Sequence, residues 1–412
     1  MPIQENRSTS VTIDGKDYVY FGGTNYLGLS RRPELMRAGA AAFEKYGFSA
    51  GASRVTSGES DLILLLESNL CAFALSEAAL VVPAGYMANS MVVDGIDDMV
   101  DAWVILPNAH SSIKTPLRQN GKPIITYSDD LDGTSIRERN SIDSESRLAY
   151  ILEPVDPLTG ELFDLNSLVP KLRKHDFLIL DEAHSFGVLG DCGRGALEHF
   201  ALIDSFQKHA VGTGGGAPVA GIGTDNRAAH GAMAINVVAE ARRRGALQAP
   251  SALIRTGTFS KAIGTYGGFI LASADVISQV KQRSGGYKAS TALSPVVAGA
   301  TIEAIRLIQS DRATTVDQLK HNIKLLNGIL HELGVDQYRH NAVPIYYLRN
   351  SSAITKLRED LPSRGIYIPT VTNYFAEYCE IGLRWTIQAG HTNEHFRFLQ
   401  QEFSRHLQPA SL

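Results

Sequence analysis

Cysteine is scarce in this chain, and its few copies lie far apart. The 412 residues include three cysteines, Cys71, Cys192 and Cys379, and no two of them form a Cys-x-x-Cys pair. Structural zinc sites and disulfide frameworks both need closely patterned cysteines, so we expect neither. We also expect no other metal site.

An excess of charge of one sign is absent too. The 39 Lys and Arg residues nearly balance the 43 Asp and Glu residues, which leaves a formal net charge of −4. This balance gives no electrostatic reason to expect nucleic acid or an anionic membrane surface as a partner.

Long apolar runs are missing as well. Glu77, Pro83 and Gly85 interrupt the most apolar region, residues 71–93, which is therefore expected to contain a helix end, a strand and a turn. A membrane span would need about 20 consecutive apolar residues. The polar start of the chain, residues 1–7, lacks the apolar stretch of a signal peptide. We expect a cytoplasmic protein.

The chain does contain a regular alternation of short apolar runs with helical periodicity. The runs lie at residues 79–83, 103–106, 148–152, 177–180 and 269–272. This alternation predicts an α/β fold whose mainly parallel central sheet is flanked by helices. Polar or small residues follow each run, where a ligand could approach the carboxyl end of a strand.

The pattern changes near residue 294. Two helical stretches, 295–308 and 316–333, precede short strands near 345–348 and 383–387. We therefore expect an N-terminal segment (1–30), a large α/β domain (31–293) with an insertion at about 200–250, and a small C-terminal α+β domain (294–412).

The most informative motif is Thr256-Gly-Thr-Phe-Ser-Lys261-Ala-Ile-Gly264, just after the apolar run 252–254. A lysine at a strand end in a dry pocket is easily neutralised and can form a Schiff base with a carbonyl. The small residues and hydroxyls around it suit pyridoxal phosphate. The alternative is a surface lysine that follows a turn.

Two polar residues follow the apolar run 177–180. Asp181 at a strand end is costly to bury unless it meets a cation, and a protonated pyridine nitrogen would be such a partner. A helix N-cap is the alternative for this aspartate. His184 could hydrogen-bond the phenolic oxygen of the cofactor, or it could be merely structural.

Two further turns offer cofactor contacts. Gly85-Tyr-Met-Ala-Asn89 follows a strand, and a glycine turn that opens a helix presents free N–H groups to a phosphate. Many such turns bind nothing. His110 could stack on an aromatic cofactor or be an ordinary loop histidine. The sequence Gly212-Thr-Gly214 invites a dinucleotide interpretation, but no clear strand precedes it.

Five motifs occur together in one order: Asn25-Tyr-Leu-Gly-Leu-Ser, Gly51-Ala-Ser-Arg-Val-Thr-Ser-Gly58, Gly85 to Asn89, Asp181 to His184, and Thr256 to Lys261. Together they resemble the α-oxoamine synthases, which are pyridoxal-phosphate enzymes of fold type I. The resemblance covers about residues 18–200 and 252–405. It implies an acyltransferase that joins a small amino acid to an acyl-CoA or an acyl carrier thioester, usually with decarboxylation.

The resemblance also implies roles for individual residues. Lys261, His110, Asp181 and His184 are the implied catalytic residues, and they also contact the cofactor: Lys261 holds it, Asp181 faces the ring nitrogen, His184 the ring oxygen and His110 the ring face. Further roles fall to Gly85, Tyr86 and Thr258 at the phosphate, to Ser290 and Thr291 of the partner subunit in a homodimer, and to Asn25 and Arg384 at the substrate.

Three departures from the family pattern stand out. Pro157 replaces a serine expected near the ring oxygen, and the segment before Asn25 is short. The insertion near 200–250 separates Asp181 from Lys261 by 261 − 181 = 80 positions. We expect it to cover the acyl-substrate entrance or to extend the dimer contact. Other possible functions are a different pyridoxal-phosphate reaction such as transamination, a non-catalytic partner protein and, on Gly212–Gly214 alone, a dehydrogenase.

Overall fold

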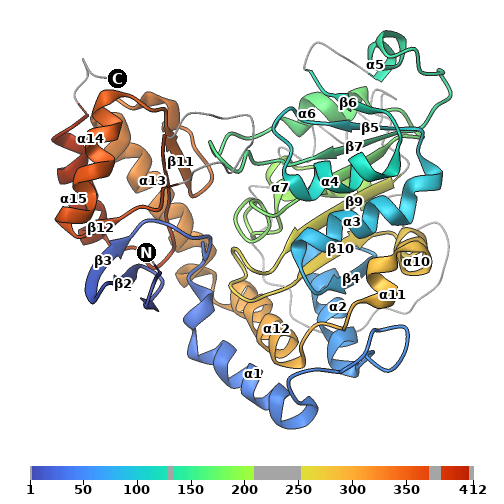
Figure 1. Cartoon of the computed structure of the whole chain (residues 1–412), viewed down its shortest axis with the longest axis horizontal. Coiled ribbons are helices and arrows are strands. Elements are labelled where there is room, and N and C mark those ends of the chain that lie inside the picture. Colours follow the sequence, from blue (N-terminus) through green and yellow to red (C-terminus); the bar gives the residue numbers. More distant parts are fainter. Residues whose placement is uncertain (1, 129–132, 208–251, 371–381, 408–412) are drawn as a thin grey trace.

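The computed structural model describes residues 2–128, 133–207, 252–370 and 382–407. Cys379, the Gly212–Gly214 motif and most of the expected insertion lie outside these residues. Figure 1 shows a large lobe built around a sheet and a smaller lobe that holds the first strands and the last helix. None of the helices in the described ranges has the length and apolar character that a bilayer crossing requires.

The large lobe is organised around a seven-stranded sheet with the order β4-β10-β9-β8-β7-β5-β6. β10 runs antiparallel to both of its neighbours, and the other adjacent pairs are parallel. The prediction of a mainly parallel sheet is therefore confirmed. The strands are β4 (Ala78–Val82), β5 (Ala102–Ile105), β6 (Ile124–Thr126), β7 (Leu148–Leu152), β8 (Phe177–Asp181), β9 (Ala252–Thr258) and β10 (Gly268–Ala272).

Helices cover both faces of this sheet, which explains the unbroken apolar runs Leu148 to Leu152 in β7 and Phe177 to Leu180 in β8. β7 and β8 are buried at every position, as expected for parallel strands between two helical layers. One face packs against α3 (Gly85–Ile96), α4 (Ser111–Asn120) and α10 (Ala274–Arg283). The other packs against α2 (Asp61–Ala74), α6 (Leu165–Leu168) and α7 (Ala196–His199).

The smaller lobe combines the two ends of the described chain. β1 (Glu5–Asn6), β2 (Ser10–Ile13) and β3 (Lys16–Tyr20) form a sheet with β12 (Ile366–Tyr367). β11 (Ile345–Leu348) pairs with β13 (Leu383–Thr386), beside α13 (Val316–Glu332), α14 (Ser352–Asp360) and α15 (Asn393–Ser404). His391 stacks on Phe21 with 4.6 Å between ring centroids, so the N-terminal segment is packed onto the C-terminal part.

Two long helices lie beneath both lobes in Figure 1. α1 (Pro33–Tyr46) packs along α12 (Pro295–Ser310), and α12 also contacts α2. Among the described residues, the remaining helices are α5 (Gly133–Arg139), α8 (Ile203–Gln207) and α11 (Gly285–Ala289), and several short 3-10 turns are also present. The domain boundary near residue 294 stays a prediction.

Candidate active site

The site lies at the carboxyl edge of the central sheet. His110 follows β5, Glu153 follows β7, Asp181 ends β8, and Lys261 comes three residues after the end of β9. Because these strands are parallel, their ends meet at one edge. The structure brings Lys261 and His184 into direct contact, with 2.8 Å between Lys261 Nζ and His184 Nε2.

Lys261 lies in surroundings that favour a neutral amine. Burial lowers the pKa of its ammonium group from 10.5 to about 8, although the charges of Asp181 and Glu153 oppose this shift. The positive charge of Arg384 lowers the pKa further. These neighbours distinguish Lys261 from a lysine that merely follows a surface turn.

We expect Lys261 in the cofactor-free protein to react with an aldehyde faster as the pH rises through about 8. Only the unprotonated amine is a nucleophile, so the rate should rise roughly tenfold from pH 7 to pH 9 and then level off. The rate at which added pyridoxal phosphate is captured measures this, with a Lys261→Ala protein as background. A rate that keeps climbing tenfold per pH unit beyond pH 9 would show an ordinary exposed lysine.

Asp181 is fixed by three elements of the fold. Its Oδ1 accepts a hydrogen bond from Ala183 N at 3.0 Å, and its Oδ2 accepts one from Asn89 Nδ2 at 2.7 Å. Thr256 Oγ1 donates to Asn89 Oδ1 at 2.6 Å and so orients that amide. Asp181 therefore stabilises a turn after β8. It does not cap a helix, because the residues that follow it form a turn. Each carboxylate oxygen retains capacity to accept from a cation.

No role was predicted for Asn89, although its position in the chain is informative. Asn89 lies four residues after Gly85, so the two share a face of α3. The turn that follows Asp181 has its own support, because Glu182 is buried and accepts a hydrogen bond from Arg255 Nε at 2.9 Å. This buried ion pair holds the segment between Asp181 and His184 in place.

Glu153 is a second site residue without a role predicted from the sequence. Its Oε2 accepts a hydrogen bond from His110 N at 2.7 Å, which ties the ends of β5 and β7 together. Burial raises the pKa of the Glu153 carboxyl from 4.5 to about 8, and the charge of Asp181 adds to this effect. The glutamate thus holds the His110 loop.

His110 is the N-cap of α4. Its Nδ1 accepts a hydrogen bond from Ser112 N at 3.1 Å and lies 2.9 Å from Ser112 Oγ. Burial lowers the pKa of this imidazole. The ring is therefore neutral near pH 7, and the start of α4 fixes its orientation, as a ring that stacks on a flat cofactor requires.

The start of α3 and the end of β9 form a small cradle. A Cβ atom on Gly85 would lie 2.6 Å from Thr258 Cβ, so only glycine allows this approach. No side chain caps α3, which leaves its first N–H groups available to an anion. Ser260 Oγ lies 2.7 Å from Thr258 Oγ1 and adds a hydroxyl, while Tyr86 is 47% exposed. These groups fit a phosphate.

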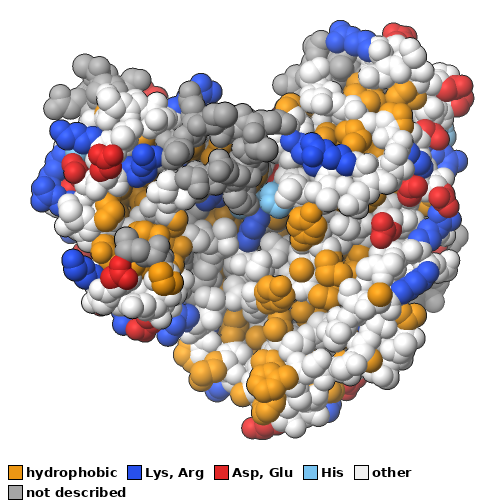
Figure 2. All heavy atoms as spheres, viewed as in Figure 1, with side chains coloured by type: hydrophobic (Ala, Val, Ile, Leu, Met, Phe, Trp, Pro, Cys, Tyr) orange, Lys and Arg blue, Asp and Glu red, His pale blue; other side chains and the backbone are white. Residues whose placement is uncertain are grey.

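Arg384 joins the two lobes, which are separated by a notch in the surface (Figure 2). It lies on β13 in the smaller lobe, and its Nε donates a hydrogen bond to the carbonyl oxygen of Pro157 at 2.9 Å. Its charge lowers the pKa values of both Lys261 and His184. Pro157 lacks the side-chain hydroxyl of the serine expected from the family, but its backbone carbonyl orients the guanidinium group of Arg384.

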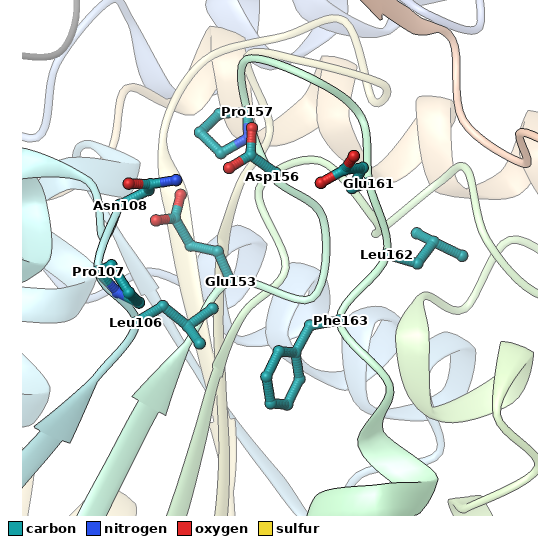
Figure 3. A pocket seen from close by; sticks show the side chains of 9 residues that line it. All are labelled: Leu106, Pro107, Asn108, Glu153, Asp156, Pro157, Glu161, Leu162 and Phe163. Carbon is teal, nitrogen blue, oxygen red and sulfur yellow. The ribbon is translucent and has the colours of Figure 1, made fainter. Parts of the chain in front are cut away.

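A cavity of about 190 Å³ lies beside Pro157. Figure 3 shows the polar ends of Asn108, Glu153 and Asp156 near one another, with Leu106 and Phe163 on the apolar side. Its lining residues are Leu106, Pro107, Asn108, Glu153, Asp156, Pro157, Glu161, Leu162 and Phe163. This space adjoins the site through Glu153, and the carboxylates of Asp156 and Glu161 disfavour an anionic ligand there.

Ser290 and Thr291 do not join the site within one protomer. Thr291 forms an isolated bridge with Ser53. Ser290 and Thr291 both line a small cavity together with Arg54. In the described part of the chain, neither residue hydrogen-bonds to Lys261 or to the cradle. Their role in the partner's site stays a prediction.

Asn25 lies on the N-terminal side of the site. Its Nδ2 donates to Ser8 Oγ at 2.8 Å, and its Oδ1 accepts from Ser30 N at 3.2 Å. The side chain therefore holds the N-terminal segment in place, next to Tyr26, whose hydroxyl lies 2.8 Å from His184 Nδ1. A role in substrate binding stays a prediction for Asn25.

This chain is similar to known proteins over nearly its whole length. The family model for aminotransferase class I and II matches residues 16–401. An 8-amino-7-oxononanoate synthase from Thermoanaerobacter pseudethanolicus is 28% identical over 391 residues, which cover 93% of this chain and 86% of that protein. A serine palmitoyltransferase from Sphingobacterium spiritivorum is 25% identical over 398 residues, covering 95% and 87%.

The solved structures agree with this fold. A serine palmitoyltransferase variant from S. paucimobilis, with bound pyridoxal phosphate and myriocin, superposes with a TM-score of 0.77 at 22% identity, covering 98% of this chain and 90% of that one. Because the family model spans most of the chain, this protein belongs to the aminotransferase class I and II family and is a pyridoxal-phosphate-dependent enzyme of the α-oxoamine synthase kind.

Proposed function

We propose that this enzyme joins a small amino acid to an acyl-CoA or acyl carrier thioester. The thiol and, in the usual course, carbon dioxide are released, and an α-amino ketone is formed. The observation that carries this proposal is the meeting of Lys261, His184 and Asp181 at the carboxyl edge of the sheet, with Arg384 close enough to lower the pKa values of the first two.

The residues at the strand ends fit the cofactor. Asp181 would pair with the ring nitrogen, His184 with the ring oxygen, and the cradle of Gly85 and Thr258 with the phosphate. His110 would cover one ring face. When bound, pyridoxal phosphate supplies an electron sink for the charge that remains when the amino acid loses its Cα proton.

Lys261 would hold the cofactor covalently and then carry the Cα proton. Its pKa of about 8 is near the operating pH, where a general base combines the correct protonation state with sufficient basicity. The charge of Arg384 helps to keep this amine unprotonated. Arg384 would bind the carboxylate of the amino acid as a two-pronged hydrogen-bond donor, while Lys261 acts on the Cα proton of the same molecule.

Replacing Arg384 by leucine should raise the KM for the amino acid about 10- to 150-fold. This range corresponds to the loss of one charge-assisted hydrogen bond, about 1.5–3 kcal/mol. Steady-state kinetics with the amino acid varied measures the change. Arg283→Leu is the matched control, because Arg283 pairs with Asp98 on the surface. An unchanged KM for the amino acid would contradict the assignment.

The function itself is tested on purified protein supplied with pyridoxal phosphate. A visible absorbance band that borohydride bleaches would show the lysine-bound cofactor. Glycine, alanine and serine are then added singly, each with acyl thioesters that end in an alkyl group or in a carboxylate. Thiol release that requires both substrates supports the proposal. A keto acid product without thiol release would favour an aminotransferase, and no spectral response to any amino acid would favour a non-catalytic protein.

We also propose that the enzyme is a homodimer. Apolar side chains of α1 and α2 and the loop between them are exposed in the single chain, among them Phe48 at 71% and Leu65 at 52%, and Figure 2 shows apolar groups gathered over this region. Large exposed apolar patches mark interaction surfaces. Light scattering should give twice the chain mass of 44.7 kDa. A monomer at micromolar concentration would refute a shared site.

A further inference from the structure

Tyr26 extends the contact between Lys261 and His184 into a chain of three side chains. Tyr26 Oη lies 2.8 Å from His184 Nδ1, and His184 Nε2 lies 2.8 Å from Lys261 Nζ. Tyr26 is fully buried and His184 is 5% exposed. Both ring nitrogens of His184 are therefore bonded to protein groups that come from distant parts of the sequence.

The chemistry of the three groups allows two arrangements of protons. Burial, and then the charge of Lys261, lowers the pKa of His184 well below its usual value, so the ring is neutral. A neutral imidazole has one N–H donor and one acceptor nitrogen, whereas a hydroxyl can donate or accept. When Lys261 is an ammonium group, Nε2 must accept from it and Nδ1–H donates to Tyr26. When Lys261 is a neutral amine, Nε2 can carry the proton and Tyr26 donates to Nδ1.

We propose that Tyr26 is a positioning residue that lets His184 change tautomer as Lys261 gains or loses its proton. The tautomer with Nε2–H can donate to an anionic oxygen such as that of the cofactor ring, and this consequence rests on the proposed function. The coupling in the cofactor-free protein does not depend on it.

The other titratable groups around these three side chains act at a distance. Asp181 and Glu153, at the ends of β8 and β7, raise the pKa of Lys261, and Arg384 from β13 lowers it. Arg384 and His110 also lower the pKa of His184. In the hydrogen-bond network of the described residues, the Tyr26 hydroxyl is the group that contacts His184 Nδ1. Its hydroxyl is therefore the feature whose removal tests the proposal.

The first experiment uses the wild-type, cofactor-free protein. Ring ¹⁵N shifts of His184 are followed from pH 6 to pH 10 in protein labelled at histidine, and the signals are assigned by their loss in a His184→Asn variant. We expect the Nδ1 and Nε2 shifts to exchange character together with the titration of Lys261. A single tautomer across this range would overturn the proposal, whatever reaction the enzyme performs.

The second experiment removes the hydroxyl with Tyr26→Phe. A buried N–H without a partner is costly, so the Nδ1–H tautomer is disfavoured and the Lys261 ammonium loses its acceptor. The midpoint for capture of pyridoxal phosphate by Lys261 should fall by about one pH unit, a tenfold change in the ionisation constant. Tyr346→Phe is the matched control, because Tyr346 is equally buried and donates to Asn327 Oδ1 at 3.0 Å, within the smaller lobe. An unchanged midpoint in the Tyr26 variant contradicts the coupling.

Discussion

Replacing Lys261 by alanine is expected to reduce thiol release by at least about 1,000-fold. The variant loses the amine that holds the cofactor and the group that would carry the Cα proton, and proton transfer by a positioned side chain alone contributes about 10²- to 10⁴-fold. The absorbance band that borohydride bleaches should also disappear. Stopped assays of thiol release and a visible spectrum of the same sample measure both effects.

A matched control separates this loss from a general effect of removing a lysine. Lys174 is exposed in the turn before β8, so Lys174→Ala should keep both the activity and the spectrum. Circular dichroism of the Lys261 variant should match that of the wild type. Retention of more than a tenth of the activity in a well-folded Lys261→Ala protein would exclude Lys261 from the chemistry.

Replacing Asp181 by asparagine should lower kcat about 100- to 1,000-fold. An amide cannot hold a proton on the ring nitrogen, and the loss of one oriented electrostatic partner in a buried site costs about 2.7–4 kcal/mol of transition-state stabilisation. The fold should tolerate the change, because Asn89 Nδ2 keeps a hydrogen bond to Ser112 Oγ at 3.0 Å. The cofactor should also bind more weakly, which equilibrium titration with pyridoxal phosphate measures.

The control for this variant is an aspartate whose side chain is exposed to solvent. The Asp191 side chain is 96% exposed and pairs weakly with Lys320, so Asp191→Asn should leave kcat and cofactor affinity unchanged. If Asp181→Asn kept kcat within threefold of the wild type, the ring nitrogen would have another partner, and the role proposed for Asp181 would be wrong.

The central strands are predictable from the amino-acid pattern because helices bury both of their faces. An unbroken run such as Phe177 to Leu180 then has no other stable place in the fold. The site residues that follow those runs were predictable for the same reason, since parallel strands put their carboxyl ends together. Lys261, Asp181 and His110 were predictable in this way. The spacing of Asn89 from Gly85 would have allowed the same prediction for Asn89.

Other features depend on how distant segments pack. An apolar run carries no information about strand direction, so the reversal of β10 appears only once its neighbours are placed. Tyr26 lies 158 positions from His184, and Pro157 lies 227 positions from Arg384. No local pattern links such pairs, because their contact is set by how the smaller lobe docks against the sheet. Local chemistry thus specifies which residues can act, and the packing of the two lobes specifies which of them meet.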